Sequence, residues 1–203
     1  MQITRRFAAL GLLLALAVFA SSADAAFDRV DIAPGGNISA VSLGPVTITV
    51  PGSEIRCTIS LGGRFSTTAM GNLDGTLTQH PLVGEFSNGA AANCTPSGLG
   101  VTLLFPSFTP WEIFVQSVGF MGTATWAVLN AQILIRGAGY ACLYTLLLGM
   151  SYDGDLFTIT TISALAVTTL AGSVFRCITA TPPSIAGTFN LLPDQRFTLI
   201  PGV

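Results

Sequence analysis

Four cysteines, one histidine and the three glutamates are the first candidates in this 203-residue chain for metal, covalent or acid–base chemistry. The cysteines are Cys57, Cys94, Cys142 and Cys177. No two of them form a C-x2-C pair and the only histidine is His80, so a zinc site is disfavoured. Four cysteines without metal-type spacing predict two disulfides in a chain that reaches an oxidising compartment.

Hydrolytic chemistry finds little support in the remaining residues. A Ser-His-Asp hydrolase would depend on His80, yet the chain has no G-x-S-x-G elbow, and a histidine followed by Pro81 is typical of a turn. A carboxylate pair could hydrolyse glycosides, and Glu54, Glu85 and Glu112 are the acidic residues outside turn contexts. Because their spacing brings no two of them together, we expect a non-enzymatic protein with no cofactor and no metal.

Aromatic residues offer a different kind of site. Phe105, Phe108, Trp111 and Phe114 cluster around two prolines, which favours their partial exposure over that of the other aromatic residues and makes them the candidate ligand contacts. The alternative is that these side chains fill the core, where aromatic residues bury large areas.

The N-terminal residues have the order of a secretory signal peptide. Arg5 and Arg6 precede an apolar core of about 14 residues, shorter than the roughly 20 that a membrane span needs. The stretch ends in Ala23-Asp24-Ala25, which predicts cleavage after Ala25 and a mature domain over residues 26–203. An N-terminal anchor helix is the alternative. We therefore expect a secreted or cell-envelope location.

Composition excludes several classes of partner. The chain has no lysine, and removal of residues 1–25 leaves six arginines against nine acidic residues. Six scattered arginines cannot form the basic stripe that neutralises phosphates, so we expect no nucleic-acid partner. No later stretch is apolar over 18 residues, so we expect no membrane span in the mature chain and, as partners, cell-envelope components.

Alternation of apolar and polar residues recurs along the chain and predicts an antiparallel β-sandwich. Turn signals such as Pro51-Gly52, Gly62-Gly63 and Asp153-Gly154 separate the alternating stretches. The clearest stretches are residues 46–50, 129–136, 157–160, 187–192 and 196–200. Residues 111–117 fit a strand better than a helix with a capping box, whereas residues 163–173 fit either a strand or a helical turn.

The two halves of the chain resemble each other when they are aligned on their cysteines. VTITVPGSEIRC corresponds to AQILIRGAGYAC, and NCTPSGLG corresponds to the region of RCITATPPSIAG. This pattern favours two degenerate β repeats over residues 40–125 and 126–203 sharing one core, although coincidence among Gly- and Thr-rich strands is the alternative. A repeat favours Cys57–Cys94 and Cys142–Cys177 among the three possible connectivities. Each bridge would then stabilise the fold by about 3–4 kcal/mol.

The stretch AFDRVDIAPGGNISAVSLGPVTIT, followed by IRCTISLGG, resembles uncharacterised exported proteins of GC-rich Gram-positive bacteria. Those proteins share an opening F-D-x-V-D-I-x-P-G-G, an IRC strand and a cysteine-bearing C-terminal section. The resemblance implies secretion and an all-β domain, and it carries no catalytic or binding residues over to this chain.

The sequence therefore predicts a non-enzymatic secreted or cell-envelope protein that acts by surface contact. The main alternative is an extracellular binding module for an apolar small molecule or a carbohydrate. An extracellular hydrolase is the less favoured third reading.

Overall fold

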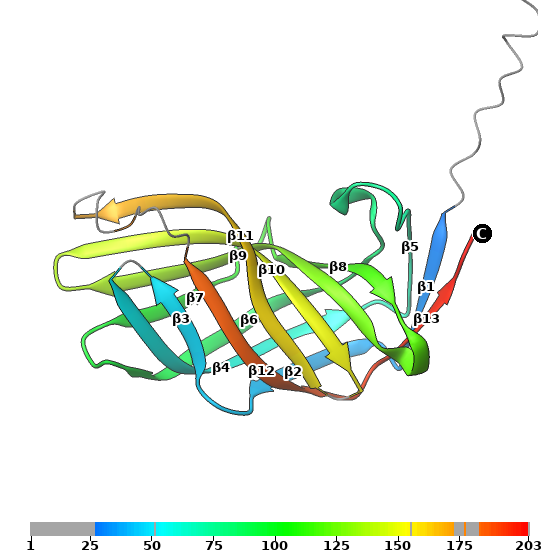
Figure 1. Ribbon diagram of the computed structural model, residues 1–203, viewed down its shortest axis with the longest axis horizontal. Helices are drawn as coiled ribbons and strands as arrows, with labels where there is room; N and C mark the ends of the chain where they lie inside the picture. Colours follow the sequence, from blue (N-terminus) through cyan, green and yellow to red (C-terminus); the bar gives the residue numbers. More distant parts are fainter. Residues whose placement is uncertain (1–26, 51, 155, 173–176, 178–182, 203) are drawn as a thin grey trace, which may run out of the picture.

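The computed structural model describes residues 27–50, 52–154, 156–172, 177 and 183–202. The predicted signal peptide lies outside these residues. Within them the chain forms thirteen strands and two short 3-10 helices (Figure 1). None of the helices found in these ranges is long and apolar enough to cross a membrane.

The first strands are β1 (Asp28–Ala33), β2 (Gly36–Ser42), β3 (Val46–Val50), β4 (Ser53–Phe65) and β5 (Thr68–Gly71), which leads into the 3-10 helix η1 (Leu77–Gln79). The middle elements are β6 (Leu82–Thr95), β7 (Gly100–Leu104), β8 (Trp111–Val118) and η2 (Phe120–Gly122). The last strands are β9 (Ala124–Gly137), β10 (Tyr140–Asp153), β11 (Leu156–Ala171), β12 (Ser184–Leu192) and β13 (Arg196–Ile200).

Ten of these strands form one antiparallel sheet that closes on itself. The order runs β10–β11–β12–β2–β4–β6–β8–β9, and β9 pairs again with β10. Like β2, the strand β3 pairs with β12 on one side and with β4 on the other. β7 and β8 pair with different lengths of the same edge of β9. Opposite parts of the sheet face each other in two layers, so the all-β antiparallel prediction is confirmed and the layering is sandwich-like within one continuous sheet.

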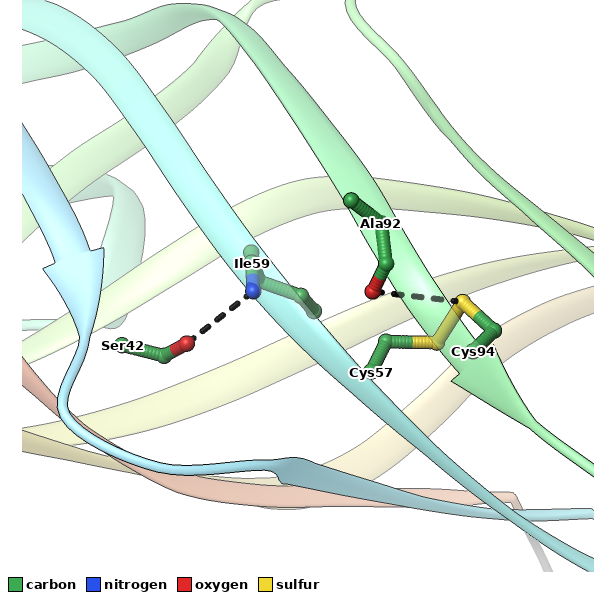
Figure 2. Close-up of a disulfide and its surroundings, with 5 residues drawn as sticks. All are labelled: Ser42, Cys57, Ile59, Ala92 and Cys94. Carbon is green, nitrogen blue, oxygen red and sulfur yellow. Dashed lines mark hydrogen bonds between the residues drawn. A yellow bond between two sulfur atoms is a disulfide. The ribbon is translucent and has the colours of Figure 1, made fainter.

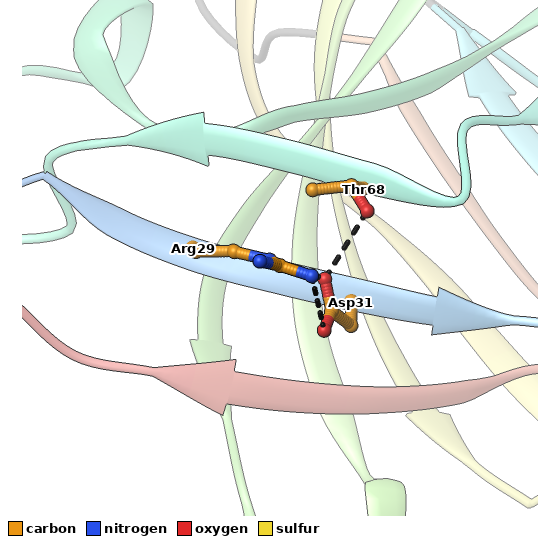
Figure 3. A network of polar contacts seen from close by, with 3 residues as sticks. All are labelled: Arg29, Asp31 and Thr68. Carbon is orange, nitrogen blue, oxygen red and sulfur yellow. Dashed lines mark hydrogen bonds and ion pairs between the residues drawn. The ribbon is translucent and has the colours of Figure 1, made fainter. Parts of the chain in front are cut away.

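A second sheet of three strands, β13–β1–β5, lies at one end of the molecule, as Figure 1 shows. On β1 the guanidinium of Arg29 donates to the carboxylate of Asp31 at 2.7 Å, and Thr68 on β5 donates to the same carboxylate at 3.2 Å (Figure 3). The hydrogen bond from Arg29 is the main reason that the pKa of Asp31 lies below its ordinary value. The exposed hydrogen bond from Thr68 joins β5 to β1, whereas the contact between Arg29 and Asp31 lies within β1.

The core between the layers is aromatic. Phe86 on β6 stacks with Phe157 on β11 at 6.4 Å between ring centroids, and Phe65 on β4 contacts Trp126 on β9 at 5.4 Å. In neither pair are the two strands neighbours in the sheet, so the contacts cross the interior. Burial of such large rings supplies much of the apolar area that stabilises the fold.

The structure corrects one local prediction and decides between the two alternatives left open for another. Gly62-Gly63, predicted as a turn, lies inside the 13-residue strand β4. The two glycines serve close packing there, since a β-carbon at Gly63 would collide with the main chain of Glu85 on β6. Residues 163–171 belong to strand β11, and no helical turn forms there. Residues 111–118 form the strand β8, as the alternation predicts.

Both predicted disulfides are present, Cys57–Cys94 and Cys142–Cys177. Cys57 is fully buried on β4, and its bridge crosses to β6, where the β4–β6 pairing shifts register (Figure 2). Beside it the hydroxyl of Ser42 accepts a hydrogen bond from the main-chain N–H of Ile59 at 3.0 Å. Two disulfides are typical of proteins in oxidising environments.

Each cysteine-bearing hairpin of the proposed repeat forms, as β3–β4 and as β9–β10. Val46 pairs with Cys57 in the first, whereas Ile135 pairs with Cys142 in the second. The two turns therefore differ in their distance from the cysteine, and the repeat stays a prediction.

Candidate functional site

Two of the four aromatic residues predicted as ligand contacts belong to the interior. Trp111 begins β8, is 1% exposed and donates its indole N–H to the carbonyl oxygen of Leu104 at 2.8 Å. Phe105 stacks on Trp111 at 4.7 Å between ring centroids and is partly buried against the core. The indole thus has its polar group satisfied and its ring covered.

The other two residues lie apart from this pair. Phe108 is 98% exposed between β7 and β8. Phe114 is buried on the opposite face of β8 from Trp111, because the two residues are three positions apart on a strand whose side chains alternate. The four aromatic residues therefore do not form one surface.

Phe114 instead lines a hollow of about 530 Å³ beside His80. The exposed side chains of Phe27, Met70 and Leu82 give this hollow an apolar rim. His80 Nε2 lies 3.2 Å from the carbonyl oxygen of Gly75, and its Nδ1 is buried without a partner among the described residues. None of the described residues that line the hollow is a serine, a cysteine or a carboxylate, and the one hydroxyl in the lining, that of Thr78, lies 3.4 Å from the Thr76 hydroxyl.

The strand register brings two of the three glutamates together. Glu85 on β6 stands directly opposite Glu112 on β8, and both line a small hollow of about 130 Å³. Arg64 on β4 forms an ion pair with Glu85 at 3.3 Å. Glu54 is elsewhere and pairs with Arg56. Sequence spacing missed the Glu85–Glu112 pair because register between strands is set by the whole sheet.

A larger, polar groove continues from Arg64 over the outer face of β2, β4 and β6. Its volume is about 520 Å³, within the range of ligand-binding pockets. Asn37 stands opposite Arg64, Ser39 stands opposite Gly62, and Gly62 stands opposite Asn88. Gly62 has no side chain of its own, and the side-chain amide of Asn88 lies over it, where a β-carbon would collide with Asn88 Oδ1.

The edge of β11 is a fourth surface of interest. β11 pairs with β12 only from Leu156 to Thr160, whereas its pairing with β10 continues to Ala171. Along residues 161–171 the second edge of β11 therefore has no strand partner among the described residues. Ile162, Leu165 and Leu170 are about half exposed on this length.

Proline and charge, which protect many edge strands, are absent here. The segment from Leu156 to Gly172 contains no proline and no charged residue.

Comparison of the chain with protein-family models, with curated proteins and with solved structures found no match.

Proposed function

We propose that the protein is an exported, non-enzymatic protein that acts by surface contact, and that the open edge of β11 is its contact surface. The unpaired length of residues 161–171 is the single observation that carries this proposal. Eleven residues of extended chain span about 36 Å. Exposed N–H and C=O groups along such an edge accept a further strand.

Export is supported by the N-terminal order of arginines, apolar core and small residues, and by the two disulfides. The resemblance to exported all-β proteins supports the same location. A non-enzymatic role is supported by the hollow beside His80, where the imidazole Nε2 contacts the carbonyl oxygen of Gly75 and the described lining holds no serine, cysteine or carboxylate.

The occupant of the edge in this proposal is a second copy of the chain. Two β11 edges can pair antiparallel about a twofold axis, and every residue of one then faces a residue of the other. Because residues 156–172 carry no charge, no register of this pairing sets like charges opposite each other. The pairing uses the open edge of both chains and therefore closes as a dimer.

Sedimentation velocity of the purified protein tests the proposal. We expect a dimer that Leu170→Lys weakens at least tenfold, since a lysine on an edge strand opposes strand addition. Leu43→Lys is the matched control, because Leu43 is 61% exposed against 55% for Leu170 and lies in the connection between β2 and β3, outside β11. A protein that is monomeric at all concentrations, or a dimer that both lysines weaken equally, would contradict the proposal.

A further inference from the structure

The polar groove on β2, β4 and β6 has the chemistry of a ligand site that the β11 edge does not explain. Its exposed side chains are amides and hydroxyls on neighbouring strands, together with one guanidinium. They are those of Asn37, Ser39, Ser60, Asn88 and Arg64.

The amide and hydroxyl groups of the groove are free to bind. Asn37, Ser39, Ser60 and Asn88 have no side-chain hydrogen-bond partner among the residues that the structure describes. Their backbones belong to strands that are paired on both sides in the closed sheet. The donors and acceptors are therefore presented on a rigid support, which lowers the entropy cost of binding.

Charge at one end of the groove decides between classes of ligand. Arg64 is paired with Glu85, and Glu112 stands on the next strand. These three residues together carry one net negative charge, so an anionic ligand would be repelled. The groups that remain unpaired are neutral and offer both donors and acceptors.

We propose that this groove binds a neutral carbohydrate. Sugar hydroxyls both donate and accept hydrogen bonds, as the amides of Asn37 and Asn88 and the hydroxyls of Ser39 and Ser60 do. Because Gly62 carries no β-carbon, the amide of Asn88 lies over it and is held close to the sheet beside Ser39. The groove lies on β2, β4 and β6 and not on β11, so each proposal can be tested and rejected independently of the other.

Titration of the purified protein with neutral oligosaccharides, followed by amide NMR spectra, tests the site. The probes are cellopentaose, maltopentaose and mannopentaose, with an oligogalacturonate as the anionic comparison. We expect saturable shifts on β2, β4 and β6 with at least one neutral probe and weaker binding of the anionic one. In Ser39→Ala/Asn88→Ala the affinity should fall about tenfold, as expected for two lost hydrogen bonds.

Thr58→Ala is the matched control, because Thr58 is exposed on β4 and lies outside the groove. It should leave the affinity unchanged, and the dispersion of the NMR spectra shows whether each variant is folded. Absence of shifts with every neutral probe at about 10 mM, where even a Kd of about 1 mM gives near saturation, would overturn the proposal. Tighter binding of the oligogalacturonate, or equal losses in the double variant and Thr58→Ala, would also overturn it.

Discussion

The hydroxyl of Tyr152 and the main chain of Gln195 are joined by two hydrogen bonds. The Tyr152 hydroxyl donates to the carbonyl oxygen of Gln195 and accepts from its N–H, both at 2.8 Å. The Gln195 side chain, buried to 1% exposure with the rest of the residue, accepts from the N–H of Gly35 at 3.0 Å. Tyr152 lies on β10, and Gln195 lies between β12 and β13. The contact therefore fixes the chain where it passes from the closed sheet to the three-stranded sheet.

Tyr152→Phe should lower the free energy of unfolding by about 1–3 kcal/mol, because it leaves the buried N–H and carbonyl of Gln195 without this partner. The phenylalanine ring can still stack on Trp126, so the loss reports on the hydroxyl alone. Urea unfolding followed by tryptophan fluorescence measures it. Tyr140→Phe is the control, and a loss in Tyr152→Phe within about 0.5 kcal/mol of that control would contradict the account.

Because of Tyr144, the free energy of unfolding should fall in alkali. Burial, helped by Tyr140, raises the pKa of Tyr144 from 10.0 to about 12. The folded state thus holds the phenol proton more tightly than the unfolded state does. The resulting stabilisation is fully present below pH 10 and is lost as the pH rises to about 12, by about 2–3 kcal/mol. Tyr144→Phe should flatten the decline measured by urea unfolding at successive pH values, and an unchanged slope would show that Tyr144 is not its source.

Glu85 and Glu112 test the non-enzymatic assignment. Like charges directly opposite on neighbouring strands are destabilising, and Arg64 is paired with Glu85 rather than Glu112. Glu112→Gln should therefore leave the stability unchanged or raise it by up to about 1 kcal/mol, with Glu54→Gln as the control. A screen of glycoside and ester substrates should find no turnover. Turnover that is abolished by Glu112→Gln, Glu85→Gln or His80→Ala would identify a hydrolase.

Local sequence patterns predicted much of the fold. Residues 46–50 and 196–200 form strands with the expected bounds, because period-2 alternation is a local property of each stretch. The similar surroundings of Cys57 and Cys142 led to both correct disulfides. The same alternation also places Trp111 and Phe114 on opposite faces of one strand, a signal that argues against a single aromatic surface.

Features that depend on the register between strands could not be predicted from local alternation. Glu85 and Glu112 are 27 positions apart in the chain and meet only through the β6–β8 pairing. Gly62-Gly63 has the composition of a turn, but the pair lies within a strand because β6 approaches β4 so closely that a side chain at Gly63 would collide with it. The polar groove has the same origin, since its residues come from three strands.

Hydrogen–deuterium exchange of the purified protein as a function of its concentration tests the contact surface most directly. At concentrations from below to above the dimer Kd that sedimentation velocity measures, we predict that amides within residues 161–171 become more protected. Amides of β4, which is paired on both sides, should not change, and Leu170→Lys should remove the effect. Exchange in residues 161–171 that does not vary with concentration would contradict the proposal that the β11 edge pairs with a second copy.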